Sequence, residues 1–237
     1  MANRAGSGGR RAVCDLPKRR SGLRIAASSY CHEAWDAVGD EAADVPDRQE
    51  REISMFAVIS DIHSNLEALE TVLADIDARG VERIICLGDI IGYGANPREC
   101  MDLIIDRVEM CICGNHDAAV FYEPYNFNVP AERAAFWTRQ MLEDEPSKAA
   151  RDRRWKFLGG LPVRTVFEGM LLVHGSPRRP INEYLFGDDV YSNPTKLMSN
   201  FERFEEVACF VGHTHVPGLF VDDPFFESPE DLSGSMY

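Results

Sequence analysis

Gly114-Asn115-His116-Asp117 is the stretch of this sequence that decides the fold. It follows an apolar run, residues 110–113, that predicts a buried strand, and Gly114 then permits a sharp turn. Three polar side chains come directly after that turn. A buried strand that ends in consecutive polar groups indicates that something polar is met there. In open α/β sheets, binding sites form at the carboxyl ends of the strands.

Four other apolar runs end in the same way. They are residues 56–60 before Asp61-Ile62-His63, 83–87 before Gly88-Asp89, 170–173 before His174-Gly175-Ser176, and 208–211 before Gly212-His213-Thr214-His215. Of the six histidines in the chain, every one except His32 falls in such a strand-end motif. Ordinary core or surface histidines would be scattered, so we expect the five strand ends to converge on one site.

The polar groups at these strand ends are of the kinds that bind metal ions. Imidazole and carboxylate suit borderline divalent ions such as Mn, Fe, Zn, Co and Ni. Asp61 and His63 are two residues apart, so in extended backbone they point the same way, and the same holds for the last two histidines. The candidate ligands are Asp61, His63, Asp89, Asn115, His174, His213 and His215. Because one ion takes roughly four to six ligands, this set predicts two ions that share a bridging carboxylate, Asp89.

Length and composition indicate an ordinary soluble protein of one large domain or two small ones. The chain has 237 residues, of which 45% are hydrophobic and 27% charged. The sequence contains no run of about 20 apolar residues, so no transmembrane helix is predicted. The formal net charge of −14 argues against broad non-specific binding to nucleic acid or to anionic membranes. The odd number of cysteines, seven, indicates reduced thiols and a cytoplasmic location.

The order of predicted elements indicates an α/β fold that changes from parallel to antiparallel pairing midway. A helix over residues 64–79 that ends at Gly80, and a second helix that begins at Asn96-Pro97, place the first three strands in two parallel βαβ units. Residues 163–173 predict a β-hairpin and therefore a second sheet. Further helices are expected within 118–160 and near 194–205, and a short strand at 219–221. For the aromatic segment 118–160, helices packed on the sheet face are favoured over a cap on the site.

The first 54 residues differ from the rest of the chain. Their first half is basic and glycine-rich, their second half is acidic, and neither shows a clear helical or strand period beyond a weak helix at 34–38. This composition predicts a disordered extension. Two alternatives stay open: that the extension is mis-assigned and translation starts at Met55, and that the basic segment 10–24 binds nucleic acid.

Taken in order, the five motifs resemble the signature of the calcineurin-like metallophosphoesterases. The resemblance covers about residues 55–217, and the stretch 88–94 together with the short length resembles the small bacterial phosphodiesterase branch. It implies a metallophosphoesterase domain over residues 55–237. It also implies an αββα fold, a two-sheet β-sandwich flanked by helices, with a dinuclear centre at the strand ends.

The resemblance also implies a role for each residue. One ion would be held by three residues and the second by three others, with Asp89 shared between them. The first three are Asp61, His63 and His215, and the second three are Asn115, His174 and His213. His116 would face the substrate, with Asp117 orienting its ring.

The implied reaction is hydrolysis of phosphodiester bonds through in-line attack by a metal-bridging hydroxide. His116 would stabilise charge on the phosphoryl oxygens and, when protonated, donate to the leaving oxygen. Arg178 and Arg179 could reach a phosphate, and Tyr93 could stack on a base or phenyl group. The expected partner is a small phosphoester or nucleotide, without stable nucleic-acid or membrane binding.

Alternatives to a phosphodiesterase stay open at this point. A phosphomonoesterase or a serine/threonine protein phosphatase would use the same residues, and a non-catalytic scaffold would bind metal without turnover. Members of the family normally continue past the Gly-His-x-His motif through further strands, whereas residues 216–237 are polar and proline-rich. We therefore expect a sheet that lacks its last strands, with an exposed edge that favours a homo-oligomer.

Overall fold

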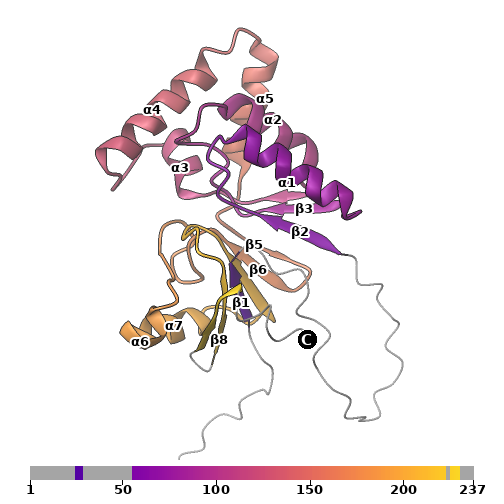
Figure 1. The fold of residues 1–237 in the computed structure, drawn as a ribbon. Coiled ribbons are helices and arrows are strands. Elements are labelled where there is room, and N and C mark those ends of the chain that lie inside the picture. Colours follow the sequence, from indigo (N-terminus) through magenta and orange to yellow (C-terminus); the bar gives the residue numbers. More distant parts are fainter. Residues whose placement is uncertain (1–24, 29–54, 223–224, 230–237) are drawn as a thin grey trace, which may run out of the picture.

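The computed structural model describes residues 25–28, 55–222 and 225–229. Two β-sheets lie at its centre, with α1 to α5 on one side of the pair and α6 and α7 on the other (Figure 1). The two-sheet sandwich flanked by helices that the sequence predicts is therefore confirmed.

The first sheet is parallel and has three strands in the order β2-β3-β4. The strands are β2 (Phe56–Ile59), β3 (Arg83–Cys86) and β4 (Met110–Cys111), and the helices that connect them are α1 (Leu66–Ala78) and α2 (Pro97–Arg107). Both predicted βαβ units are confirmed, and α1 ends just before Gly80, whose φ is 70°. The last strand is shorter than predicted because Cys113 leaves the ladder and donates its backbone N–H to Pro162 O at 2.8 Å.

The second sheet is mixed and has six strands in the order β5-β6-β7-β1-β8-β9. Its strands are β5 (Arg164–Phe167), β6 (Met170–Val173), β7 (Ala208–Val211), β1 (Ile25–Ser28), β8 (Gly218–Val221) and β9 (Phe225–Glu227). The predicted hairpin is β5 and β6, which pair antiparallel. The pairing of β6 with β7 is parallel, so both deliver their carboxyl ends to the same edge.

Two of these strands correct the sequence-based expectation. Ile25–Ser28 lies in the extension expected to be disordered, yet it pairs with β7 on one side and with β8 on the other. Hydrogen bonds to two neighbouring strands order a run that is too short to show a period of its own. The tail expected to be polar contains β9, which pairs with β8, so the sheet continues past the Gly-His-x-His motif.

The other predictions for the extension concern residues that the structure does not describe, including the weak helix at 34–38 and the basic segment 10–24. The domain boundary at residue 54 stays a prediction.

Three helices follow β4 and form an outer layer. They are α3 (Asn115–Phe121), α4 (Val129–Glu143) and α5 (Lys148–Gly160). The side chain of Arg154 on α5 is only 7% exposed. Its guanidinium forms ion pairs with Asp102 on α2, from Nη2 to Oδ2 at 2.6 Å, and with Glu145, from Nη1 to Oε2 at 2.8 Å. On the other side of the sandwich, α6 (Asp189–Ser192) and α7 (Pro194–Phe201) cover the six-stranded sheet (Figure 1).

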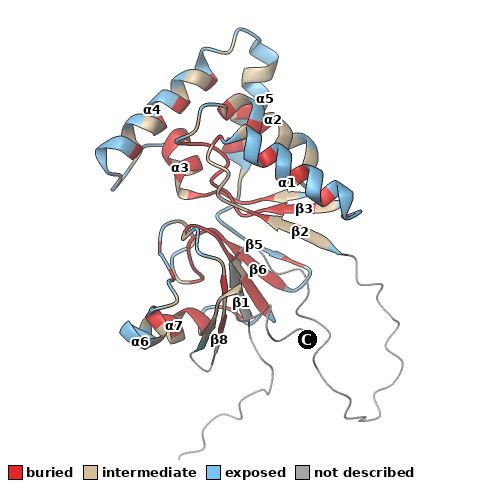
Figure 2. Ribbon diagram, in the orientation of Figure 1, coloured by how far each residue is buried: buried red, intermediate tan, exposed pale blue. Residues whose placement is uncertain are grey.

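The core between the sheets is apolar and closely packed. Ile85, Leu87 and Ile112 from the first sheet side meet Leu172 and Phe167 from the second, and all five are buried. Figure 2 shows buried residues along the strands and on the inward sides of the helices. The described cysteines are also buried free thiols: Cys86, Cys100, Cys111, Cys113 and Cys209.

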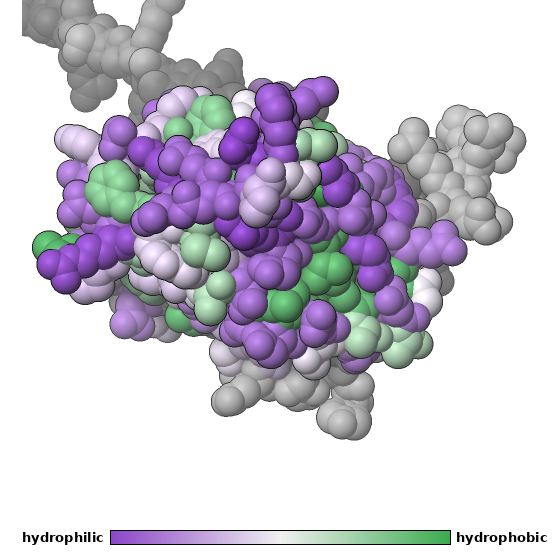
Figure 3. Space-filling model, turned by 90° about the horizontal axis from the view of Figure 1, so that it is seen from above, coloured by the Kyte–Doolittle hydropathy of each residue, from purple (hydrophilic) through white to green (hydrophobic). Residues whose placement is uncertain are grey.

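The helical face seen from above is mostly hydrophilic, with separate apolar patches (Figure 3). Among the described residues, no helix has both the length and the apolar character that a membrane span needs.

Replacement of Ile85 by alanine tests the packing between the sheets. Ile85 is fully buried between them, so we expect Ile85→Ala to lower the free energy of unfolding by about 2–5 kcal/mol. Val163→Ala, at a position with 48% exposure, should change it by less than about 0.5 kcal/mol. Urea unfolding of both variants makes the comparison, and equal losses would contradict a core at Ile85.

Candidate metal centre

The loops after five strands bring the predicted ligands together. The loop after β2 carries Asp61 and His63, that after β3 carries Asp89, that after β6 carries His174, and that after β7 carries His213 and His215, while Asn115 is the first residue of α3, directly after the β4 loop. Six of the seven fall into two groups whose nitrogen and oxygen atoms lie close enough for one ion each: Asp61 with His63 and His215, and Asp89 with His174 and His213. A third such group overlaps both and joins His63 and Asp89 to His116. The predicted convergence of the strand ends therefore exists in the fold.

The backbone of these loops is left-handed rather than extended. The φ angle is 56° at Asp61, 49° at His63, 53° at Asp89, 70° at His213 and 55° at His215. Residues with a Cβ rarely adopt this region, and such strain clusters at functional sites. The expectation of extended backbone was therefore wrong at these residues. Asp61 and His63 nevertheless reach the same group, whereas His213 and His215 belong to different groups, as the family resemblance implies.

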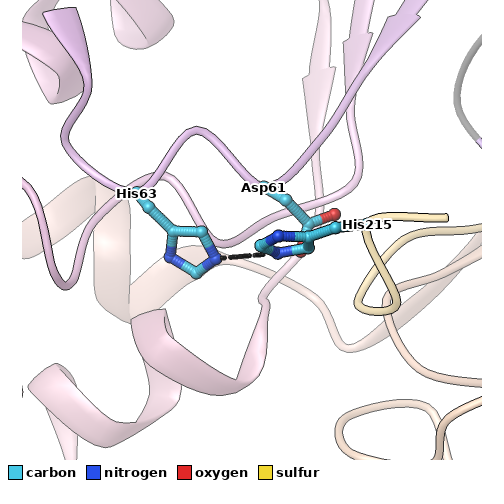
Figure 4. Close-up of side chains that lie close together, drawn as sticks. All are labelled: Asp61, His63 and His215. Carbon is cyan, nitrogen blue, oxygen red and sulfur yellow. Dashed lines mark hydrogen bonds and ion pairs between the residues drawn. The ribbon is translucent and has the colours of Figure 1, made fainter. Parts of the chain in front are cut away.

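Asp61, His63 and His215 form the first group (Figure 4). The two imidazole Nε2 atoms lie 3.1 Å apart. Asp61 Oδ1 is 3.2 Å from the Nε2 of His215 and 4.0 Å from that of His63. Ligand atoms that share one ion at about 2.1 Å lie about 3–3.5 Å from one another, so the spacing fits a cation. The His215 side chain is 55% exposed, which leaves this group open to solvent on one side.

The second group is more deeply buried. His174 Nε2 lies 3.2 Å from Asp89 Oδ2 and 3.0 Å from Asn115 Oδ1. The other ring nitrogen, Nδ1, lies 2.9 Å from Leu87 O, a contact in which the ring donates its proton and leaves Nε2 for the site. His213 Nε2 is buried without a hydrogen-bond partner among the described residues. A buried polar atom is costly to leave unpaired, so this nitrogen also fits a cation.

Asp89 lies between the two groups. Its Oδ2 is 3.7 Å from His63 Nε2 and 3.2 Å from His174 Nε2. Burial alone would raise the pKa of the Asp89 carboxyl, but the charge of His174 and the hydrogen bond from it hold that pKa below its usual range. Burial likewise opposes charge on His174, yet Asp89 raises the pKa of its imidazole to about 9. Without a metal ion, the His174 ring therefore carries a second proton that faces Asp89. A bound cation would replace that proton.

Asp117 does not orient the His116 ring, and this expectation is corrected. Its Oδ2 accepts the backbone N–H groups of Asp89 at 2.7 Å and Gly114 at 3.0 Å, and its Oδ1 accepts those of Ile90 at 3.0 Å and Ile91 at 3.4 Å. Burial raises the pKa of the Asp117 carboxyl to about 7, and these donors oppose the shift because they stabilise the carboxylate. Asp117 thus joins the loop after β3 to the loop after β4.

His116 lies among aromatic rings beside the two groups. Its ring centroid is 4.4 Å from that of Tyr93, 4.7 Å from that of His63 and 4.8 Å from that of Phe127. A Cβ on Gly92 would come within 2.5 Å of His116 Nδ1, so only glycine leaves room for the ring. Burial lowers the pKa of His116 to about 4, which makes the ring neutral near pH 7 with one N–H to donate.

The segment after α3 bears on the predicted choice between packed helices and a cap. α4 and α5 pack against α2 and α3, so they form a layer on other helices and not on the sheet face that was favoured. Phe127, in the loop before α4, nevertheless contacts the His116 ring. One residue of the segment therefore reaches the edge of the site.

Arg178 has partners other than a phosphate. Its guanidinium forms an ion pair with Glu183 and donates from Nη1 to Ser199 Oγ at 3.0 Å. Glu183 is buried and also accepts from Ser176 Oγ at 2.7 Å and from Asn200 Nδ2 at 3.2 Å. This network holds the loop after β6, and a role of Arg178 toward a phosphate stays a prediction.

The other two predicted substrate-binding residues are exposed. Arg179 donates its backbone N–H to Ser176 Oγ at 3.0 Å, and its role toward a phosphate stays a prediction. Tyr93 is 53% exposed beside His63 and His116, as a stacking residue would be.

Sequence reasoning missed Tyr184. Its ring stacks on the His213 ring with a centroid distance of 3.8 Å and an angle of 18°. It follows Glu183, so the network around that carboxylate fixes its position. The sequence held one weak signal for it, an aromatic residue in the loop after a predicted ligand strand.

Known proteins are similar to this chain in sequence and in fold. The family model for calcineurin-like phosphoesterases matches residues 54–217. An uncharacterized protein of Methanocaldococcus jannaschii is 41% identical over 174 residues, which cover 69% of this chain and 63% of that protein. The crystal structure of a metallophosphoesterase from Sphaerobacter thermophilus is 39% identical, with a TM-score of 0.56, and the match covers 69% of this chain and 61% of that one.

A crystal structure of a putative diadenosine tetraphosphatase is 16% identical, with a TM-score of 0.38 and coverage of 68% of this chain and 54% of that one. The chain spans less than two thirds of the length of each of these three relatives.

Asp117→Asn tests whether this carboxylate joins the two loops. An amide NH₂ in place of one oxygen faces N–H donors, so we expect the free energy of unfolding to fall by at least about 1–3 kcal/mol. Asp144→Asn, at an exposed position, is the matched control and should change it by less than about 0.5 kcal/mol. Unfolding free energies that are equal for wild type and Asp117→Asn would refute the role of Asp117 in joining the loops.

The Glu183 network predicts a pH dependence of stability. Its hydrogen bonds hold the pKa of Glu183 at about 2 despite burial, below the usual value of 4.5 for a glutamate. A lowered pKa in the folded state stabilises the protein above pH 4.5, and that stabilisation is lost as the pH falls from 4.5 toward 2. The difference in melting temperature between wild type and Glu183→Gln should therefore narrow across this range, while Glu70→Gln, an exposed control, shows no such change.

Proposed function

The chain belongs to the calcineurin-like phosphoesterase family, and we propose that it hydrolyses phosphodiester bonds at a centre for two divalent metal ions. The observation that carries this proposal is the position of Asp89, whose Oδ2 lies within 4 Å of a histidine from each group. A carboxylate in that position can be shared by two ions, which in two-metal sites lie about 3.5–4 Å apart.

The proposed ligand set divides between the two groups. Asp61, His63 and His215 would hold one ion, Asn115, His174 and His213 would hold the other, and Asp89 would be common to both. The unpaired Nε2 of His213 and the proton on His174 Nδ1 support this division, because each leaves a nitrogen lone pair for a cation. Imidazole with oxygen ligands favours Mn, Fe, Zn, Co or Ni.

When bound, the two ions supply positive charge for the phosphoryl oxygens and lower the pKa of a water molecule. The residues of the chain set the geometry. Asp117 holds the loops that carry Asp89 and Asn115 at fixed separation. His116, kept in place by Gly92 and Phe127, can donate one N–H to a phosphoryl oxygen.

The charge around the centre favours a diester over a monoester. A monoester carries a second negative charge near neutral pH and needs additional positive charge in the protein. Arg178, the cation expected to supply it, is paired with Glu183. The same centre could still act on monoesters, so the two ester classes are compared directly in the experiment below.

We expect the protein, after a chelator has stripped its metal, to hydrolyse bis-p-nitrophenyl phosphate only when Mn²⁺ is added back. The rate on p-nitrophenyl phosphate should be lower. His116→Ala should reduce kcat by about 10²–10⁴-fold, since it removes the donor to the phosphoryl oxygen. Glu70→Gln, an exposed substitution, should keep the wild-type rate.

A thermal shift measurement separates metal binding from turnover. Mn²⁺ should raise the melting temperature of the wild type but not that of Asp89→Asn, because binding to the native state stabilises it. A folded protein that binds Mn²⁺ and hydrolyses neither ester would show the metal-binding scaffold instead. A faster rate on the monoester would point to a phosphomonoesterase.

A further inference from the structure

A cavity of about 470 Å³ opens beside the first group of ligands. Its lining includes Asp61 and His63 from the loop after β2, Tyr93 and Asn96 from the loop after β3, and Glu67 from α1. Its volume falls in the range of small-molecule sites, about 300–1,000 Å³. A phosphoester bound at the metal centre would have one substituent next to this space.

Asn96 is unusual among the capping asparagines of this chain. Four described helices begin after an asparagine, and in α1, α4 and α7 its side-chain oxygen accepts a backbone N–H of the first turn. Asn96, before α2, makes no such hydrogen bond. Its amide is therefore uncommitted, with donors and an acceptor available to a molecule in the cavity.

Tyr93 presents a half-exposed ring to the same cavity. Its φ is 60°, a strained value for a tyrosine, and 53% of the residue is exposed. Backbone hydrogen bonds from Gly94 N to His63 O, at 2.9 Å, and from Asn96 N to Ser64 O, at 3.1 Å, fix its loop against the loop after β2. The strained backbone and the hydrogen-bonded loop hold the Tyr93 ring in place, so it is pre-organised for stacking.

The charge of the lining excludes a second phosphate from this space. The described residues that line the cavity include no lysine or arginine, and besides Asp61 of the first metal group the acidic one is Glu67. An anion on that side would face the Glu67 carboxylate with no cationic side chain of the lining to offset it. The occupant must therefore be neutral or cationic, planar enough to stack, and polar at its edge.

We propose that this cavity binds the nucleobase of a nucleoside phosphoester, with Tyr93 stacking on its face and the Asn96 amide hydrogen-bonding its edge. Aromatic stacking suits every base, and an asparagine amide can pair with the adenine edge through two hydrogen bonds. The inference rests on the proposed phosphoesterase function and specifies the substrate class of that site.

Two diesters with the same leaving group test the proposal. Thymidine 5′-p-nitrophenyl phosphate carries a nucleoside where methyl p-nitrophenyl phosphate carries a methyl group. The ratio of their kcat/KM values therefore reports how much the nucleoside contributes to transition-state binding. We expect a ratio of about 5- to 100-fold in the wild type, which corresponds to about 1–3 kcal/mol of stacking. Tyr93→Leu and Asn96→Ala should each lower the ratio, and Tyr93→Phe should keep most of it.

Tyr191→Leu is the matched control, since Tyr191 is 85% exposed on α6 and does not line the cavity. It should leave the ratio unchanged. A wild-type ratio near one, or a high ratio that survives both Tyr93→Leu and Asn96→Ala, would overturn the proposal while the phosphodiesterase activity stands.

Binding without turnover separates this proposal from the proposed function. By calorimetry, the Mn²⁺-loaded protein should bind adenosine 5′-monophosphate about 5-fold or more tightly than ribose 5-phosphate, and Tyr93→Leu should remove the difference. If neither diester is hydrolysed, the proposed activity fails and the calorimetric difference still decides the nucleobase site. Equal affinities in the wild type would overturn it.

Discussion

The buried carboxylate of Asp117 is the constraint on which the site depends. It accepts four backbone N–H groups, three from the loop after β3 and one from Gly114. At the same place the two loops nearly touch, since a Cβ on Gly88 would lie 2.3 Å from Gly114 N. Only glycines allow this approach, and only a group with two acceptor oxygens can bind both backbones. Asp89, Asn115 and His116 then take their positions from these loops.

The arrangement of charge in the site favours a cation over any internal partner. Asp61 and Asp89 contribute carboxylates, while His63, His174, His213 and His215 contribute nitrogens that face the same space. In the protein alone, a proton on His174 meets part of this demand, since its pKa is about 9. Burial lowers the pKa of His213 to about 4, so its ring stays neutral and its Nε2 stays unpaired. Together these features are those of residues that await a cation and not those of a self-sufficient ion-pair network.

Polar residues near the centre divide into those that face it and those that hold its loops. Arg178 resembles a phosphate ligand in the sequence, yet its guanidinium anchors Glu183, and that carboxylate fixes the loop that brings Tyr184 onto His213. Asn96 resembles a helix cap, yet its amide caps nothing and lines the cavity beside Asp61. In both cases the sequence shows the residue type but does not predict its role, because the role depends on contacts with other loops.

Strands β2 to β8, the two βαβ units, the hairpin and the set of polar residues at the strand ends could all be predicted from the amino-acid sequence. These follow from local patterns, since apolar runs, helical periodicity and turn residues act over a few neighbours along the chain. Only the tertiary structure decided that Asp117 bonds to backbone and not to His116, and that Ile25–Ser28 completes a sheet between β7 and β8. Each of these depends on contacts between residues far apart in the chain, which no local pattern encodes.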